Sequence, residues 1–312
     1  YGADILRIWV VSADYSEDLR ISDEILRYQA DSYRRLRNTL RYLLGNLAGF
    51  DEAERVEPAA MPELERWVLH RLAELDAQVR RCCDDFDFHT LFSALHNFCA
   101  TDLSALYFDV RKDSLYCDRP DSLRRRAART VLDVLFSCLT AWLAPILCFT
   151  AEEAWRTRFP GDGDSVHLRR FPDIPASWRD DALAEKWSTV RRLRRVVTGA
   201  LEVERRDKRI GSSLQAHPTV HAPAEYVAAM DGVDLAEITI TSAATLVEGK
   251  PPKAAFTLDD VADIGVVAGQ AEGEKCARCW RVLPEVGGVP GHSDLCGRCA
   301  DAVAAAPVAE AG

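Results

Sequence analysis

The sequence lacks the short motifs that mark most self-contained catalytic sites. It has no glycine-rich phosphate loop, no GxSxG nucleophile elbow and no Ser-His-Asp or Cys-His set at a recognisable spacing. It also lacks an uninterrupted apolar run long enough to cross a membrane, and no secretory signal peptide can be identified. We therefore expect a cytoplasmic protein whose chain does no chemistry by itself.

Positive charge is also in short supply. The chain has 39 lysines and arginines against 49 acidic residues, so its formal net charge is -10 at pH 7. Such a surface disfavours nonspecific binding of nucleic acid or membranes, and a polyanionic partner would have to bind to local basic faces. With 312 residues and 48% hydrophobic content, the chain is long enough for one sizeable core and one or two smaller units.

Four of the ten cysteines have the spacing of a metal site. Cys276 and Cys279 form one CxxC motif, and after sixteen residues Cys296 and Cys299 form a second. This spacing predicts one zinc ion held by four thiolates. Because four protein ligands close the tetrahedron, the zinc would be structural rather than catalytic. The alternatives are His292 in place of one cysteine, or a pair of disulfides.

The remaining cysteines argue against disulfides. They share no spacing, and most lie in apolar stretches, so they are interpreted as buried free thiols in a reducing cytosol: Cys82, Cys83, Cys99, Cys117, Cys138 and Cys148. Residues 273–302 contain few large apolar side chains, mainly Trp280, Val282, Leu283 and Leu295. Metal binding would therefore supply the folding energy of this segment.

Apolar residues spaced alternately by three and four predict four long helices. The first begins after Ser22, a plausible N-cap, and runs towards Leu47. The others cover about 64–79, 88–110 and 123–144, with Pro145 bending or ending the last before a further helical stretch at 149–155. The fourth helix is expected to turn Leu123, Ala127, Val131, Val134 and Cys138 inward. Long helices joined by short loops predict a mainly α fold, an antiparallel helix bundle.

The composition changes after about residue 157. A connector rich in proline, glycine and aspartate precedes a basic helix from about 182 to 206. Short runs at 219–221, 237–242 and 261–267 are predicted as strands around a helix at 224–230, which makes a small α/β unit. The four-cysteine zinc knuckle follows, and the alanine-rich end at 303–312 is expected to be disordered.

Arginines gather on single faces of several predicted helices. Such a face is either solvated or able to bind phosphates. The candidate phosphate-contacting arginines on helices are Arg34, Arg37, Arg41, Arg124, Arg191 and Arg195.

The knuckle itself contains two arginines and a tryptophan. Arg278 and Arg298 each precede a cysteine, so they either contact phosphate or screen the negative charge of the thiolates. Trp280 either stacks on a base or packs over the knuckle, and packing is favoured because the segment has so few apolar residues. Basic helices, a bundle and this knuckle together are typical of a surface that binds folded RNA.

These features resemble the carboxy-terminal third of the bacterial-type isoleucyl-tRNA synthetases, which are class I aminoacyl-tRNA ligases. The stretches at 1–7 and 18–22 are similar to the segment that follows the family's KMSKS loop. The anticodon-binding bundle of the family is resembled, in order, at 37–39, 50–51, 97–99, 112–116, 144–146, 149–155 and 210–216. Valyl- and leucyl-tRNA synthetases share much of that pattern. The tail from Glu274 to Trp280, with Cys296–Cys299, resembles the isoleucyl enzymes, whereas valyl enzymes typically end in a coiled coil and no heptad run occurs here.

The resemblance implies a domain order, a partner and cofactors. The order is a stem-contact segment (1–22), the anticodon-binding bundle (23–157), a connector (158–181), a helix with a small α/β junction domain (182–272), the zinc-binding domain (273–302) and the tail (303–312). The partner is isoleucine tRNA, with no DNA and no membrane, and the chain would act as part of a monomeric full-length ligase. ATP and isoleucine would bind only to a catalytic domain that this sequence does not contain, so the chain alone is expected to be inactive.

The sequence does not exclude three alternative functions. The chain could be a free-standing zinc-dependent RNA-binding module, a fragment of a valyl- or leucyl-type synthetase, or a zinc-stapled helical scaffold for protein partners. Anticodon preference would distinguish the first two from the isoleucyl assignment, and the absence of tRNA binding would indicate the third.

Overall fold

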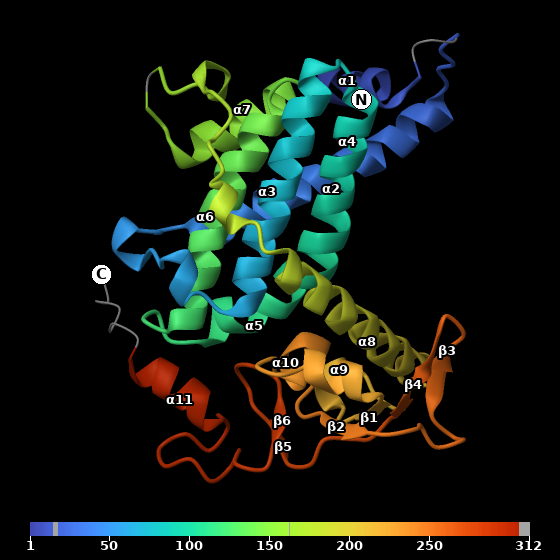
Figure 1. Cartoon of the computed structure of the whole chain (residues 1–312). Coiled ribbons are helices and arrows are strands. Elements are labelled where there is room, and N and C mark those ends of the chain that lie inside the picture. The colour runs from blue at the N-terminus through green and yellow to red at the C-terminus, as the bar shows by residue number, and fades with distance from the viewer. Residues whose placement is uncertain (15–17, 162, 306–312) are drawn as a thin grey trace. The chain divides into compact units, whose positions relative to one another are not determined.

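A computed structural model describes residues 1–14, 18–161 and 163–305 (Figure 1). Its α-helices are α1 (Ala3–Ser12), α2 (Asp23–Leu47), α3 (Glu63–Asp84), α4 (Phe88–Asn97), α5 (Asp109–Cys117), α6 (Leu123–Leu143), α7 (Cys148–Arg158), α8 (Asp181–Arg206), α9 (Ala224–Ala229), α10 (Leu235–Thr239) and α11 (Gly297–Ala304). The strands are β1 (Thr219–Ala222), β2 (Thr245–Glu248), β3 (Phe256–Leu258), β4 (Val261–Val267), β5 (Glu274–Lys275) and β6 (Val282–Leu283). The tail at 303–312, predicted to be disordered, lies mostly outside the described residues.

The chain forms two compact units. The first comprises residues 1–111 and 126–180, and the second comprises residues 112–125 and 181 onward. The boundary therefore passes through α5 and through the first turn of α6.

The first unit is a helix bundle, as the apolar spacing predicts. Helix α1 packs against α2, α4 and α7, and α3 packs against α4. The largest fully buried side chains of this unit include two tryptophans and the leucine stripe of α2 (Trp67, Trp142, Tyr107, Phe136, Ile8, Leu36, Leu40, Leu43, Leu69, Leu72 and Leu95). Burial of these side chains is the main stabilising term of the bundle.

Helix α2 begins where the sequence predicts. The Ser22 side chain accepts a hydrogen bond from the backbone N of Ile25 at 3.2 Å, which caps the first turn. Asp23 and Glu24 follow in that turn, where the helix dipole favours acidic groups. The predicted apolar stripe is buried at its leucines, while Tyr33 is half-buried.

The third predicted helix is longer and less regular than expected. It consists of α4, a π-helical segment (Phe98–Phe108) and α5, so it ends at Cys117 rather than near residue 110. The wider turn of a π-helix changes the angular position of each side chain, and the apolar residues still reach the core.

The second unit contains a four-stranded sheet in the order β2-β1-β4-β3. Strand β1 pairs parallel with β2 and antiparallel with β4, and β3 pairs antiparallel with β4. Helix α8 packs on this sheet, where a Cβ at Gly199 would meet the Phe256 ring at 3.0 Å. Glycine therefore permits the close approach of α8 to β3.

Two predictions about individual elements are wrong. Residues 237–242 do not form a strand, because Asp234 caps a helix by accepting from the backbone N of Ala236 and Glu237, and Ile240 ends that helix in the left-handed region. Local capping thus outweighs the β-propensity of the run. Leu123, predicted to face inward, is 51% exposed and Val134 is half-buried, whereas Ala127, Val131 and Cys138 of the same stripe are buried.

Within the described residues, no helix has the length and apolarity needed to cross a membrane.

Candidate metal centre and RNA-contact residues

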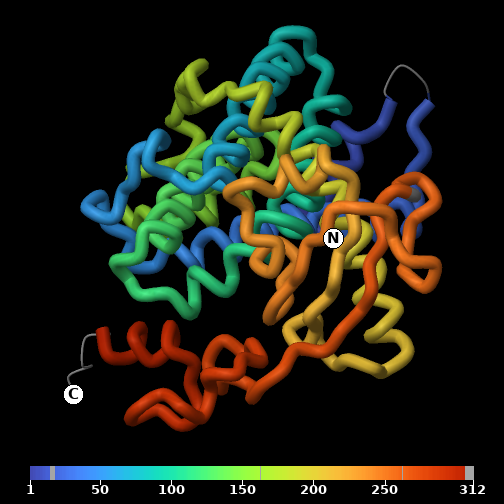
Figure 2. The backbone as a smooth tube through the Cα atoms, turned by 60° about the horizontal axis from the view of Figure 1, so that its bottom comes forward, coloured from blue at the N-terminus to red at the C-terminus, as the bar shows by residue number. Residues whose placement is uncertain are grey.

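Two short backbone structures present the four predicted ligands. Between β5 and β6, the backbone N of Trp280 donates to the carbonyl of Cys276 at 2.9 Å, and the N of Cys276 donates to the carbonyl of Arg281 at 2.9 Å. Cys296 is the N-cap residue of α11, and Cys299 lies in its first turn. Figure 2 follows the chain from this hairpin into the final helix. Each CxxC motif thus forms a tight turn that brings its two sulfurs together.

Glycine is required at the start of the first knuckle. Gly273 has φ +111°, and a Cβ there would lie 2.3 Å from the backbone of Leu283. The two chains of the β5–β6 ladder, which pairs Glu274 with Leu283, could not approach in this way with any other residue.

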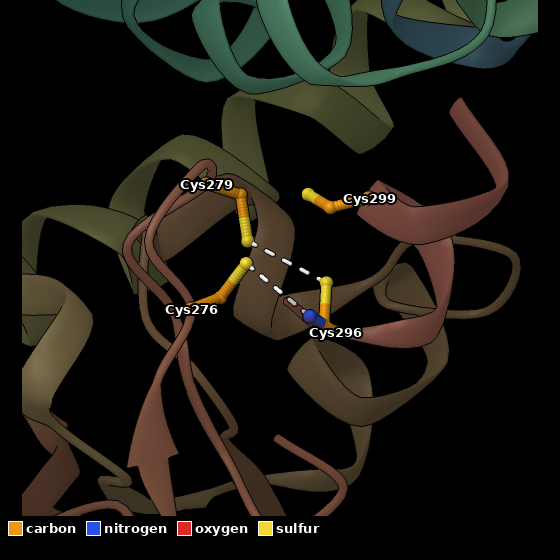
Figure 3. Close-up of side chains that lie close together, drawn as sticks. All are labelled: Cys276, Cys279, Cys296 and Cys299. Carbon is orange, nitrogen blue, oxygen red and sulfur yellow. Dashed lines mark hydrogen bonds between the residues drawn. The ribbon is translucent and has the colours of Figure 1, made fainter. Parts of the chain in front are cut away.

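The four sulfur atoms converge on one point. The Sγ atoms of Cys276, Cys279, Cys296 and Cys299 all lie within 4.8 Å of one another, and all four residues are buried (Figure 3). The sulfurs of Cys279 and Cys296 are 3.8 Å apart. A tetrahedral zinc ion with bonds of about 2.3 Å places its sulfur ligands about 3.8 Å apart. The residues therefore fit a zinc ion, and the cluster contains four cysteines without His292.

The environment of the sulfurs favours a bound cation. Burial raises the pKa of Cys279 to about 11 and raises the pKa of Cys299 as well. For Cys276, burial opposes ionisation, but backbone N–H donors of Cys279, Cys296 and Arg278 outweigh it and lower the pKa to about 6. Four thiolates at such short distances repel one another, and a divalent metal removes that repulsion.

The apolar support of the site is small. Val286, Leu295 and Ala300 pack with the four cysteines and with Cys117, and Leu283 and Val289 cover part of the cluster. This apolar cluster is too small to hold the fold by burial alone. Its size agrees with the prediction that the folding of residues 273–302 depends on metal binding.

Trp280 does not take part in this cluster. It is 61% exposed, and its ring is contacted by Lys275, whose Nζ lies 5.4 Å from the ring centroid. The preferred prediction, that Trp280 packs over the knuckle, is therefore wrong. The reason is its backbone: φ of Trp280 is +65°, a conformation that closes the Cys276 turn and directs the side chain outward.

The two knuckle arginines contact protein atoms. The Arg278 guanidinium donates to the carbonyls of Cys117 and Tyr116, and its Nη1 lies 3.8 Å from Cys299 Sγ. Arg298 forms ion pairs with Asp113 and Asp118. Screening of thiolate charge, one of the two predicted roles, matches the position of Arg278.

The arginines of α2 lie on the surface. Arg34, Arg37 and Arg41 are all exposed, Arg34 pairs with Asp31 one turn earlier, and Arg37 lies 3.8 Å from Glu153. Among the described residues, no ion pair or hydrogen bond involves the Arg41 guanidinium.

The other helix arginines are in more constrained positions. Arg124 Nε donates to Asp118 Oδ2 at 3.0 Å, and its Nη1 donates to Glu237 Oε1 at 3.0 Å. Arg195 forms an exposed ion pair with Asp260 on the same unit, and Arg191 is half-buried on α8.

Sequence reasoning missed the protein partners of Arg278 and Arg298. Asp113, Cys117 and Asp118 lie more than 150 positions before the knuckle. The only signal available was the placement of an arginine at the third position of both CxxC motifs.

Two protein-family models match segments of the chain. A family model described as the anticodon-binding domain of tRNA ligase matches residues 65–220, which is half of the chain. A second, described as a zinc finger found in FPG and IleRS, matches residues 273–302 and includes all four clustered cysteines.

Similar proteins give a consistent result. Three relatives named isoleucine--tRNA ligase come from Ruegeria pomeroyi (57% identical over 96% of this chain), Agrobacterium fabrum (54% over 97%) and Caulobacter vibrioides (55% over 97%). In each case the match covers 31% of the relative. The chain thus spans about a third of the length of the curated relatives it matches, at their C-terminal end.

Proposed function

We propose that this chain, which belongs to the family of tRNA-ligase anticodon-binding domains, is the tRNA-binding part of an isoleucine--tRNA ligase. In this proposal the helix bundle holds the anticodon arm of isoleucine tRNA, and the knuckle forms a second contact supported by zinc. The ligase reaction, which joins isoleucine to its tRNA with ATP, requires the part of the relatives' sequence that this chain does not match. The assembled ligase is cytoplasmic and monomeric, and its domains follow the boundaries predicted from the sequence.

The four-cysteine cluster carries the proposal. Valyl- and leucyl-type ligases share the anticodon-binding fold, so the bundle alone leaves the amino acid open. The convergent sulfurs of Cys276, Cys279, Cys296 and Cys299 lie in the segment that matches the zinc finger found in FPG and IleRS, and the relatives matched over nearly the whole chain are named isoleucine--tRNA ligase. One zinc ion held by these thiolates has no open coordination position, so it supports the fold and takes no part in chemistry.

The exposed arginines of α2 are the best candidates for phosphate contact. Within the part of the chain that the structure describes, the Arg41 guanidinium has no ion pair or hydrogen bond, and the partners of Arg34 and Arg37 are screened by solvent. Arg195 is similar, since its pair with Asp260 is exposed. Arginine in such positions pairs with phosphate and fixes the orientation of the nucleic acid.

Trp280 is the best candidate for contact with a base. A tryptophan held at positive φ is strained, and glycine would fill that position more easily. Such strain is typical of functional positions, and an exposed aromatic ring can stack on an unpaired base. Lys275 beside the ring adds a positive charge suited to the neighbouring phosphate.

The remaining predicted contacts are weaker candidates. Arg124, Arg278 and Arg298 bind protein groups, and Arg191 is half-buried. Contact with RNA would require these side chains to exchange partners.

Binding of zinc-loaded chain to isoleucine tRNA transcript tests the proposal directly. The same transcript with a swapped anticodon, two salt concentrations and a chelated sample complete the experiment. Tighter binding to the native anticodon, weakened by salt and by chelation, is the expected result. Equal binding to both transcripts would instead indicate a general RNA-binding module, and no binding at all would exclude tRNA as the partner of this chain.

A further inference from the structure

Each CxxC motif forms its own turn, and we call these two turns the two knuckles of the zinc-binding segment. They share one feature that the metal does not explain. In both CxxC motifs the third residue is arginine, Arg278 in the first and Arg298 in the second. Both side chains reach the same short stretch at the end of α5, residues Asp113–Asp118, which we call the anchor segment. All these residues belong to the second unit.

Arg278 binds the backbone of the anchor segment. Its Nη1 donates to the carbonyl of Cys117 at 2.5 Å and its Nη2 donates to the carbonyl of Tyr116 at 2.9 Å. These two carbonyls lie in the last turn of α5, where helix carbonyls have no intrahelical partner and a cation is favoured. The Cys117 side chain also packs in the cluster of the four predicted ligands.

Arg298 binds the acidic side chains of the same segment. Its Nη2 donates to Asp113 Oδ1 at 2.7 Å, its Nη1 contacts the other oxygen of that carboxylate, and Nη1 donates to Asp118 Oδ1 at 3.0 Å. The Asp118 side chain is only 6% exposed, and Arg124 Nε binds its other oxygen. A bidentate, partly buried arginine–carboxylate pair fixes orientation as well as distance.

We propose that the anchor segment is a template that holds the two knuckles in register for the metal, so that zinc binding and ordering of this segment are coupled. The inference rests on the proposed zinc site. Each knuckle supplies two of the four sulfurs, and a metal site forms only when the two pairs face each other. Tethering both knuckles to one rigid helix end reduces the entropy that metal binding would otherwise remove.

Coupling of this kind acts in both directions. If an intact anchor segment increases metal affinity, bound metal must stabilise the anchor segment by the same factor. Loss of zinc would release Arg278 and Arg298, so that Asp113 would lose its bidentate partner and Asp118 would keep only Arg124. The end of α5 would then become less ordered and more negative, which disfavours an approaching polyanion.

The same contacts argue against the rival role of Arg298, and of Arg124 beside it, as a phosphate ligand. Around Asp118, the cations Arg124 and Arg298 are outnumbered by the carboxylates of Asp113, Asp118 and Glu237. A phosphate at this position would have to displace a carboxylate from each guanidinium.

Release of zinc from the loaded chain to an excess of a chromogenic chelator tests the template. Arg298→Ala should release zinc about 10- to 100-fold faster than the unaltered chain, because removing a group that orients metal ligands usually weakens metal affinity by that factor. Asp113→Asn should act in the same direction and less strongly, and adding it to Arg298→Ala should change little, because both remove one interaction. Arg119→Ala is the matched control, since Arg119 directly follows the anchor segment and its guanidinium, within the described residues, forms its ion pair with Asp121 two positions away.

Arg298→Lys covers the case in which the alanine variant does not fold. Lysine keeps the positive charge but cannot bind a carboxylate with two parallel donors as the guanidinium does, so this variant should also release zinc faster than the unaltered chain. Amide exchange measured with and without zinc tests the reverse direction: residues 113–118 should exchange faster in the chelated chain, while exchange in helix α8 should not change.

Each outcome decides between the proposals. If Arg298→Ala released zinc as slowly as the Arg119→Ala control, the template would be overturned. The same holds if amide exchange in the anchor segment were equal with and without zinc. Neither result would affect the proposed tRNA function. A chain that binds no zinc would overturn both the template and the proposed metal site. Absence of tRNA binding would count against the proposed function alone, because no step of this test contains RNA.

Discussion

Arg111 and Glu65 form a buried ion pair inside the helix bundle. Arg111 Nη2 donates to Glu65 Oε2 at 2.7 Å, Nε donates to Oε1 at 2.5 Å, and the two side chains are 4% and 0% exposed. The Tyr107 hydroxyl donates to the same carboxylate at 3.2 Å. Both oxygens of the Glu65 carboxylate thus have partners. The ion pair fixes α3, which carries Glu65, against α5, which carries Arg111.

Removing one partner of this pair should destabilise the bundle strongly. Glu65→Ala leaves a buried guanidinium without its counter-charge, and we expect the free energy of unfolding to fall by about 3–5 kcal/mol. Urea titration followed by circular dichroism measures the change. The double variant Glu65→Leu with Arg111→Met should recover most of the loss, and the exposed pair variant Arg34→Ala should cost less than about 1 kcal/mol. A Glu65→Ala chain as stable as the Arg34→Ala control would contradict this account.

The arginine face of α2 should control the salt dependence of tRNA binding. Arg41→Ala is expected to weaken binding to native and anticodon-swapped tRNA equally and to reduce the slope of log affinity against log salt by about 1. Fluorescence anisotropy over a salt series gives the slope. Arg124→Ala is the comparison, because its ion pairs are internal to the second unit. An unchanged slope for Arg41→Ala would remove this face from the interface.

Trp280 should contribute to tRNA affinity and not to stability. Stacking on one base is worth about 1–3 kcal/mol, so Trp280→Ala should weaken binding about 5- to 150-fold, while Trp280→Phe keeps most of the affinity. The melting temperature should not fall in either variant because the ring is exposed. Leu168→Ala is the control, since Leu168 is an exposed apolar side chain of the bundle unit. If Trp280→Ala binds tRNA as well as this control does, the ring does not stack on a base.

Two buried thiols should resist alkylation in the folded protein. Burial raises the pKa of both Cys99 and Cys138 to about 12. Because a raised pKa favours the neutral thiol, both groups should be almost entirely un-ionised at pH 8, and the thiolate is the reactive form. Mass spectrometry after iodoacetamide treatment should find both unmodified in native protein and modified in denaturant. Rapid labelling of either in the native chain would show that the bundle opens more readily than its packing indicates.

Much of the fold could be predicted because its signals are local. The apolar stripe of α2 and its cap at Ser22 depend on residues within one or two turns of each other. The metal cluster could be predicted for the same reason, since each CxxC motif builds its own turn and only two turns have to meet. All ten cysteines are unbridged, as expected, although Cys83 and Cys148 are half-buried rather than buried.

The wrong predictions concern residues on which two physical effects act in opposite directions. The run at 237–242 has the β-branched composition of a strand, but the cap at Asp234 starts a helix before it. Trp280 is the largest apolar residue of the knuckle, but the positive φ of its turn directs the ring outward. Composition alone could not rank these effects against each other.

The sequence by itself determined the helix bundle, the four cysteines of the metal site and the family resemblance, since all three depend on spacing along the chain. Only the tertiary structure decided what the arginines do. Arg41 and Arg298 look alike in the sequence, yet one guanidinium is exposed and the other binds Asp113 and Asp118. Whether a charged side chain is available to a ligand depends on groups 180 or more residues away, which no local pattern encodes.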